Sequence, residues 1–154
     1  MTIMKLKNIA IIIMFLCSMS AFSETFADKY MDKKGATVIY ISKAMLKMFP
    51  NVETGVDINS VLPKLESIVV ITSEKQDIKE EMKNDIAKLK KDKTYETLMK
   101  ISEENSKVDI YAKMKSNDII NEILMVVDEA KECVIIQLCG NLTTKDIEKL
   151  SNSN

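Results

Sequence analysis

The pattern of hydrophobic and polar positions is clearest between Val108 and Leu142, where three apolar segments are separated by two short polar breaks. The breaks, Lys115–Asp118 and Asp128–Glu132, are only long enough for tight turns. Segments rich in Ile and Val that are joined by breaks this short are typical of antiparallel hairpins. The stretch therefore predicts a β-meander against which the rest of the chain packs.

The three predicted strands differ in their patterns. The first alternates strictly, which predicts one buried and one wet face, because neighbouring side chains on a strand point to opposite sides. The segments Ile119–Val127 and Cys133–Cys139 are apolar at almost every position, so we expect central strands covered on both faces. In the first strand the expected buried positions are Val108, Ile110, Ala112 and Met114, and the expected wet positions are Asp109, Tyr111, Lys113 and Lys115.

Upstream of the meander, the spacing of apolar residues predicts two short helices around one strand. Ala36–Ile41 is rich in β-branched and aromatic residues, as strands are. Ser42 is placed to cap a helical turn or two that stops before Pro50. Glu24–Lys34 has the pattern of an amphipathic helix that ends at Gly35. The apolar face of that helix holds Phe26, Ala27, Tyr30 and Met31.

The middle of the chain predicts a loop at Asn51–Asp57, then a short helix, a strand and the longest helix. Pro63 interrupts the helical spacing of Asp57–Leu65, so we expect an irregular or single-turn helix there. Ser67–Thr72 has the composition of a buried strand. A capping-box pattern predicts that the longest helix opens at Ser73 and runs through Lys91, with one apolar stripe facing the sheet. Its capping residues are Ser73 and Gln76, and its stripe is Ile78, Met82, Ile86 and Leu89.

Three further elements complete the predicted fold. Glu103–Ser106 has the composition of a hairpin turn into the meander. Thr143 and Asp146 have the spacing of a capping box for a last short helix, so the sequon at Asn141 is interpreted as part of that loop and cap. A strand is expected at Tyr95–Ile101, with Tyr95, Thr97, Met99 and Ile101 on one face.

The order of these elements predicts an α+β fold, with a largely antiparallel sheet that ends in a β-meander and is backed by helices. We expect a single domain over residues 24–150, followed by a disordered tail at 151–154. Eleven methionines raise the question of a soft binding surface, but we interpret most of them as residues that fill gaps in the core.

The first 23 residues have the features of an export signal. Lys5 and Lys7 give a basic start, an apolar core follows, and Ala21 and Ser23 have the spacing that a signal peptidase requires. The chain is therefore expected to be exported, to the periplasm or beyond, with no transmembrane span in the mature chain. Lipoprotein anchoring through Cys17 is the alternative, but Leu16 is larger than the residue that normally precedes a lipidated cysteine.

The composition excludes several classes of function. The chain has no Arg, and removing Lys5 and Lys7 from 22 basic residues leaves 20 against 23 acidic ones, which argues against nucleic-acid recognition. With no His, the chain lacks imidazole-based catalysis and imidazole metal sites. It contains three glycines and no phosphate-binding loop. No cofactor and no metal is expected.

Three segments resemble the family known as domain of unknown function 4252, which consists of exported proteins found mostly in Bacteroidetes. The segments are Val38–Leu46, Ser73–Lys75, and Gly140–Thr143 with Asp146 and Ile147. The resemblance covers nearly all of the mature chain, although its motifs are short and mostly hydrophobic. It implies a location in the cell envelope, often with a lipid anchor, and gene neighbours that are sigma and anti-sigma regulators. The family has no defined catalytic residues, so the catalytic residues of this chain stay unknown.

Two arrangements of residues could in principle support catalysis. Ser42 and Lys43 could form a nucleophile and base, but adjacent side chains diverge, so Ser42 is better explained as a helix cap. Glycoside hydrolysis needs two carboxylates across a cleft. Glu122 is the most notable acid because it lies in an apolar strand, where Lys113 could be its cross-strand partner. A position at the strand end or on a solvent-exposed face of the sheet is the explanation that we prefer. The other available carboxylates are Asp109, Asp128 and Glu129.

Cys133 and Cys139 are expected to remain free thiols. Both lie in one predicted strand, where six residues span about 20 Å, whereas a disulfide requires Cα atoms about 4.4–6.8 Å apart. Their even spacing places them on one face of the strand, as small apolar core residues.

These observations lead us to interpret the chain as a non-enzymatic binding or regulatory module of the cell envelope with an unidentified envelope partner or ligand. A carboxylate-dependent hydrolase acting on glycans and a carrier of a small hydrophobic ligand stay open as alternatives. Two carboxylates facing each other in a deep pocket would favour the hydrolase. An apolar cavity between the helices and the sheet would favour the carrier. A flat surface with an apolar patch would favour the binding module.

Overall fold

The fold is seen in a computed structural model, which describes residues 26–48 and 59–151. The predicted signal peptide, including Cys17, the loop Asn51–Asp57 and the last three residues of the predicted tail lie outside the described residues.

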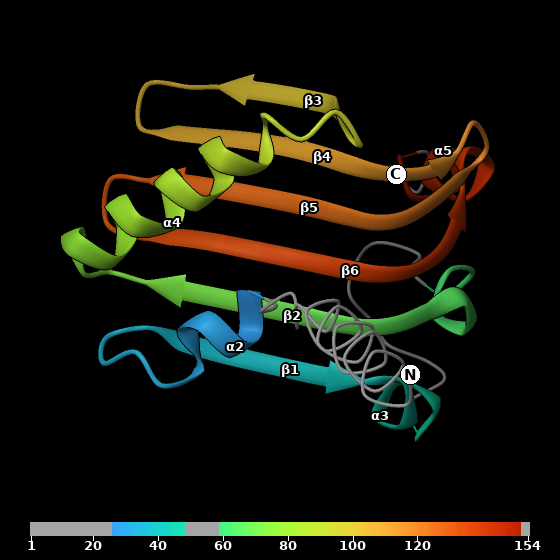
Figure 1. Ribbon diagram of the computed structural model, residues 1–154, viewed down its shortest axis with the longest axis horizontal. Helices are drawn as coiled ribbons and strands as arrows, with labels where there is room; N and C mark the ends of the chain where they lie inside the picture. The colour runs from blue at the N-terminus through green and yellow to red at the C-terminus, as the bar shows by residue number, and fades with distance from the viewer. Residues whose placement is uncertain (1–25, 49–58, 152–154) are drawn as a thin grey trace, which may run out of the picture.

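Six antiparallel strands form one sheet in the order β1-β2-β6-β5-β4-β3 (Figure 1). Strands β4, β5 and β6 form the predicted meander, and β3 extends it by pairing with β4. On the other side β2 pairs with β6, and β1 pairs with β2. The predicted α+β class and the predicted order of elements are confirmed. The strands are β1 (Thr37–Ser42), β2 (Leu65–Ser73), β3 (Tyr95–Ser102), β4 (Ser106–Ser116), β5 (Ile119–Glu129) and β6 (Cys133–Thr143).

One face of the sheet, which we call the helix face, is covered by α2 (Phe26–Met31) and α4 (Gln76–Leu89). Figure 1 shows both helices in front of the sheet, with α4 crossing from the end of β2 towards β3. Apolar side chains from both helices and from alternate strand positions form the main buried cluster beneath them. Its members include Tyr30, Met82 and Ile86 from the helices, and Val69, Ile71, Leu124, Val126 and Ile135 from the strands.

The opposite face, which we call the open face, is covered at one end by short elements. They are α3 (Lys43–Met48), the 3₁₀ turn η1 (Leu62–Lys64) and α5 (Thr144–Ser151), and α3 and α5 lie at the right-hand end of Figure 1. These elements enclose a second buried cluster with the strand residues beneath them. That cluster includes Leu62, Leu65, Ala112, Ile120, Ile123 and Leu142, with Leu46, Ile68, Leu138 and Ile147 packed against it.

Two predicted helix caps are confirmed. The Ser42 hydroxyl accepts a hydrogen bond from the Met45 amide at 3.3 Å, which satisfies a free N–H group at the start of α3. At the start of α5, the Asp146 carboxylate accepts from the Thr143 amide at 2.8 Å and the Thr143 hydroxyl accepts from the Asp146 amide at 3.4 Å. This reciprocal pair is a capping box.

The predicted capping box of α4 is wrong. Ser73 is the last residue of β2, and α4 begins at Gln76 without a side-chain cap and ends at Leu89. The Ser73 hydroxyl donates to the Gly35 carbonyl at 2.7 Å and accepts from the Lys75 amide, so it joins the strand end to the loop after α2. Helix α2 also ends earlier than predicted, at Met31 instead of Lys34, and its Met31 is exposed instead of buried.

The predicted faces of β3 also need correction. Thr97 pairs with Tyr111, but Met99 pairs with Ile110, because the register shifts between the two residues of β3. Tyr111 belongs to the main cluster under α4, whereas Ile110 packs against the second cluster on the open face. A bulge adds one residue to a strand and so reverses the facing of the positions beyond it. Tyr95 and Thr97 therefore lie on the helix face, and Met99 and Ile101 lie on the open face.

The predicted cover of the meander is wrong in two respects. The face of β4 that was expected to be wet carries Tyr111, which is buried beneath α4, and half-buried Asp109. The central strands β5 and β6 are covered along the helix face, but on the open face the described elements cover one end alone.

Candidate functional site

Beyond the second cluster, the open face presents two rows of residues that run across all six strands. Register partners define each row, because residues opposite one another on neighbouring strands share a face. We call these two rows the apolar patch. One row is Ile39, Val70, Ile136, Met125, Ile110 and Met99, and the other is Thr37, Thr72, Val134, Val127, Val108 and Ile101.

The apolar patch contains no charged residue, and its only polar groups are the two threonine hydroxyls. Ile110 packs against the second cluster at the margin, and the other members lie outside both buried clusters. Exposure is greatest on the outer strands, where Ile39 is 51% exposed, Met99 48% and Ile101 43%. A flat, uncharged, apolar area of this kind is a binding surface more often than an accident of folding.

The β3–β4 and β5–β6 turns lie at one end of the sheet, which we call the turn end. Polar groups border the apolar patch at this end. The Thr72 hydroxyl donates to the Glu132 carboxylate at 3.2 Å. Beyond it lie the two hairpin turns, which come together around Ser106 and Ala130. An apolar centre with a polar rim is the usual anatomy of a protein–protein interface.

The apolar patch is not apparent from the sequence pattern. The signals were present, namely continuous apolar character in β5 and β6 and a large number of methionines, but both were interpreted as core. Several methionines are in fact exposed, among them Met31, Met45, Met48 and Met99.

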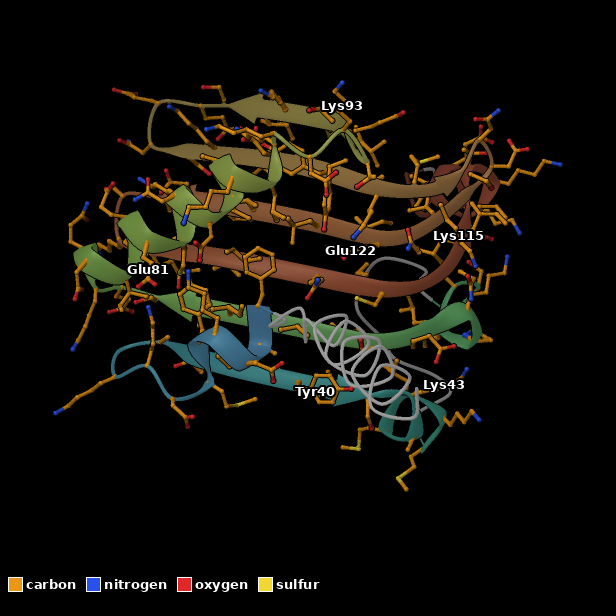
Figure 2. The ribbon with its side chains drawn as sticks, viewed as in Figure 1. Tyr40, Lys43, Glu81, Lys93, Lys115 and Glu122 are labelled. Atoms are coloured by element: carbon orange, nitrogen blue, oxygen red, sulfur yellow. The ribbon has the colours of Figure 1, made fainter. Side chains whose placement is uncertain are left out.

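The predicted Glu122–Lys113 relationship is confirmed as a cross-strand register pair. The Glu122 carboxylate accepts a hydrogen bond of 2.9 Å from the Tyr95 hydroxyl, which reaches across from β3. Lys113 lies between them, with its Nζ 5.4 Å from the centre of the Tyr95 ring. Burial and the neighbouring carboxylate raise the pKa of Tyr95. Figure 2 shows Glu122 on the helix face, beyond the end of α4.

The structure does not bring the other candidate carboxylates to Glu122. Asp109 is four residues from Lys113 along β4, and Asp128 is six residues from Glu122 along β5, so each lies well over 10 Å away along the sheet. Asp109 accepts from the Tyr111 hydroxyl at 2.9 Å, and Asp128 pairs with Lys83 at 2.9 Å. No facing pair of carboxylates across a deep pocket is found among residues 26–48 and 59–151, so no observation favours the hydrolase.

Ser42 and Lys43 do not form a catalytic pair. The Ser42 hydroxyl caps α3, while the Lys43 ammonium pairs with the Glu66 carboxylate at 2.5 Å. The hydroxyl and the amine are therefore engaged with different partners.

A partly buried ionic cluster between α2 and α4 has a structural role. The Asp85 carboxylate accepts hydrogen bonds from the Lys29 ammonium and from the Tyr30 hydroxyl, and Lys33 pairs with Glu81 one turn earlier. Burial opposes ionisation of Asp85, but the bonds from Lys29 and Tyr30 outweigh it and lower the pKa of this carboxyl. The cluster joins the two helices that cover the helix face.

Both cysteines are free thiols, as predicted. Cys133 is buried in the main cluster, and burial, with the Asp128 carboxylate nearby, raises the pKa of its thiol to about 11. Burial and Glu122 also raise the pKa of the Cys139 thiol. A thiol with a raised pKa carries little of the reactive thiolate at neutral pH.

One mainly apolar hollow of about 280 Å³ opens on the surface between α3 and η1, and Leu46, Leu62, Pro63 and Leu65 are among the residues that line it. It is not the apolar cavity between the helices and the sheet that a carrier of hydrophobic ligands requires. Within the described ranges, acidic and cysteine side chains form no group of three or more that could hold a metal ion. No helix in this part of the chain combines the length and apolar character needed to cross a bilayer.

Comparison with known proteins gives one match. The model of a family described as "Domain of unknown function (DUF4252)" matches residues 30–150, which include all six strands. No curated protein and no solved structure matches the chain.

Proposed function

The chain belongs to the DUF4252 family, and we propose that it is an exported, non-enzymatic binding module of the cell envelope. In this proposal the apolar patch docks an apolar, uncharged surface of another protein. The helix face supplies the stable core, and the open face supplies the binding surface.

The observation that carries the proposal is that the described part of the chain leaves the apolar patch uncovered. Its two rows run across all six strands, and the described elements cover only the neighbouring end of the face. The largest contiguous apolar patch on a soluble protein is often functional, because it marks a site of contact with another molecule. Such a face in a small domain is therefore best explained by a partner that removes it from water.

The chemistry of the apolar patch selects a protein as the partner. A small ligand needs a concave site that surrounds most of its surface, and no residue of the apolar patch lines the hollow at the hairpin turns or the one between α3 and η1. Peripheral binding to a bilayer normally combines aromatic side chains with clustered lysines, and the apolar patch contains neither. A flat and uncharged surface is complemented by another flat and uncharged protein surface.

The proposed location rests on the N-terminal sequence. The basic start, the short apolar core from Ile9 to Leu16 and the small residues at Ala21 and Ser23 favour export with cleavage before Glu24. A processed protein of this kind is released outside the cytoplasm, so we propose that its partner is also in the cell envelope.

Site-specific photo-cross-linking in the native cell tests the proposal. A benzophenone-bearing amino acid is placed at position 99, in the apolar patch, or at position 31, on α2. Met99 and Met31 provide a matched pair, because their side chains are alike and 48% and 51% exposed. We expect a discrete cross-linked protein product from position 99 and none from position 31. No product at position 99, or equal products at both positions, would contradict the proposal.

A further inference from the structure

We propose that the occupant of the apolar patch is the same patch of a second copy of this chain, giving a two-fold symmetric dimer with its sheets face to face. This inference rests on the proposed function, because it names the partner of the surface assigned there.

Self-pairing is favoured by the uniform chemistry of the apolar patch. A two-fold interface brings one surface against itself, so a charge near the axis would face the same charge. The apolar patch presents Val, Ile, Met and Thr side chains and no charge. Two such faces can interdigitate at the usual spacing of about 10 Å between packed sheets.

Helices α3 and α5 and the turn η1 cover one end of the open face, which we call the helical end. They determine how the second copy can lie. A two-fold axis parallel to the strands would place α3, η1 and α5 of both copies at the same end, where they would collide. An axis that lies between the sheets and crosses the strands at right angles avoids this. Each copy then fits its turn end against the helical end of the other, and its strands run roughly along those of the other copy.

The charges of the two hairpin turns complement those of the opposite end in this arrangement. The β3–β4 and β5–β6 turns have an excess of acidic residues, and the helical end has an excess of basic residues. Opposite charges around an apolar centre fix orientation and suppress wrong pairings. The two turns hold Glu103, Glu104, Glu129 and Glu132 against Lys107 and Lys131; the helical end holds Lys43, Lys47, Lys64, Lys145 and Lys149 against Glu66, Asp146 and Glu148.

The size of the apolar patch agrees with a dimer of modest affinity. Strands lie about 4.8 Å apart and alternate residues about 7 Å apart, so two rows across six strands cover roughly 400 Å² of flat area. With side-chain relief and the rims included, two copies bury about 1,000 Å² in total, the lower limit for a specific interface. We therefore expect the dimer population to depend strongly on protein concentration.

Analytical ultracentrifugation of the purified exported chain, over a wide range of concentration, tests the inference. We expect the wild-type chain to pass from monomer to dimer as its concentration rises. Met99→Lys places a charge in the apolar patch and should weaken the dimer by about tenfold or more. Met31→Lys makes the same change at equal exposure on α2 and should leave the dimer unchanged. Thermal unfolding of each variant establishes that it folds, and Met125→Lys repeats the test at the centre of the patch.

A wild-type chain that stays monomeric at every concentration would overturn the inference, as would equal dissociation constants for Met99→Lys and Met31→Lys. Failure here is distinguishable from failure of the proposed function. If the purified chain is monomeric but position 99 cross-links to a different protein in cells, the docking surface stands and the second copy is excluded. If position 99 gives no product and the purified chain is monomeric, both proposals fall.

Discussion

Met125 and Ile136 are register partners on β5 and β6, in the middle of the sheet, yet neither belongs to a buried cluster. Their neighbours along the same strands, Leu124 and Ile135, point to the other side and are fully buried beneath the helices. The same two strands thus supply the core on one face and the apolar patch on the other. The central claim is that this second face is a binding surface.

The first prediction concerns the packing of α4 against the helix face of the sheet. Met82 is fully buried in the main cluster, so Met82→Asp should destabilise the fold by about 3–5 kcal/mol or prevent folding. Asn84 is exposed on the same helix, and Asn84→Asp should change stability by about 0.5 kcal/mol or less. Urea unfolding measures both, and similar losses in the two variants would show that the apolar stripe of α4 does not face the sheet.

Asn84 is a better control in α4 than Lys83. The sequence pattern places Lys83 on the solvated side of the helix, but its Nζ pairs with Asp128 on β5 at 2.9 Å. This bond, with burial opposing it, raises the pKa of Lys83. A charge reversal at Lys83 would therefore also remove a contact between α4 and the sheet.

The second prediction concerns pH. The Asp146 carboxylate accepts bonds from Lys64 and Thr143, and the Lys64 bond is the main reason that the pKa of Asp146 falls to about 2. Because this pKa lies below the unfolded value of about 3.9, the carboxylate stabilises the fold above about pH 4. That contribution, about 1–2 kcal/mol, is lost as the pH falls from 4 towards 2.

Asp146→Asn should therefore lower stability at pH 7 and flatten its dependence on pH below 4. Asp118→Asn, in the exposed turn between β4 and β5, should leave the dependence as it is. Thermal unfolding between pH 2 and 7 measures this, and an unchanged acid profile in Asp146→Asn would exclude this carboxyl as the titrating group.

The third prediction concerns the thiols. Cys133 is fully buried and its pKa is raised to about 11, so it should react with a thiol reagent only after the chain is unfolded. Titration with and without denaturant measures this. The intact mass should be the same before and after reduction. A gain of two daltons on reduction would mean that Cys133 and Cys139 are bonded, which the geometry of β6 forbids.

The fourth prediction concerns processing of the exported chain. Its first residue should be Glu24, with no lipid attached, because Leu16 makes a poor neighbour for lipidation at Cys17. Intact-mass analysis of the protein from the native envelope measures this. A diacylglycerol-modified N-terminus at Cys17 would contradict the prediction and place the protein on a lipid anchor.

The meander could be predicted because period-two alternation and short polar breaks are local signals. The caps at Ser42 and Thr143 were predictable for the same reason. Ser73 was not, because its hydroxyl bonds to Gly35, which is distant in sequence. The facing of Met99 was also unpredictable, since the bulge after Thr97 arises from pairing with β4 and leaves no mark in the local pattern.

The candidate site was missed for a more general reason. Strands β5 and β6 are apolar on both faces, and sequence alone does not distinguish an apolar face covered by its own helices from one covered by a partner. Because α2 and α4 both lie on the helix face, residues 26–48 and 59–151 leave the apolar patch open. The apolar stripe of a helix shows which side of the helix is buried. It does not show which face of the sheet the helix covers.

The most direct test of the central claim is the rate of methionine oxidation by dilute peroxide in the exported protein inside intact cells, measured by peptide mass spectrometry. Met99 and Met31 are 48% and 51% exposed, so they should oxidise at similar rates in purified protein diluted to monomer. If the apolar patch is occupied, Met99 should oxidise several-fold more slowly than Met31 in cells. Equal rates for Met99 and Met31 in cells as well as in dilute solution would show that nothing covers the apolar patch and would contradict the account.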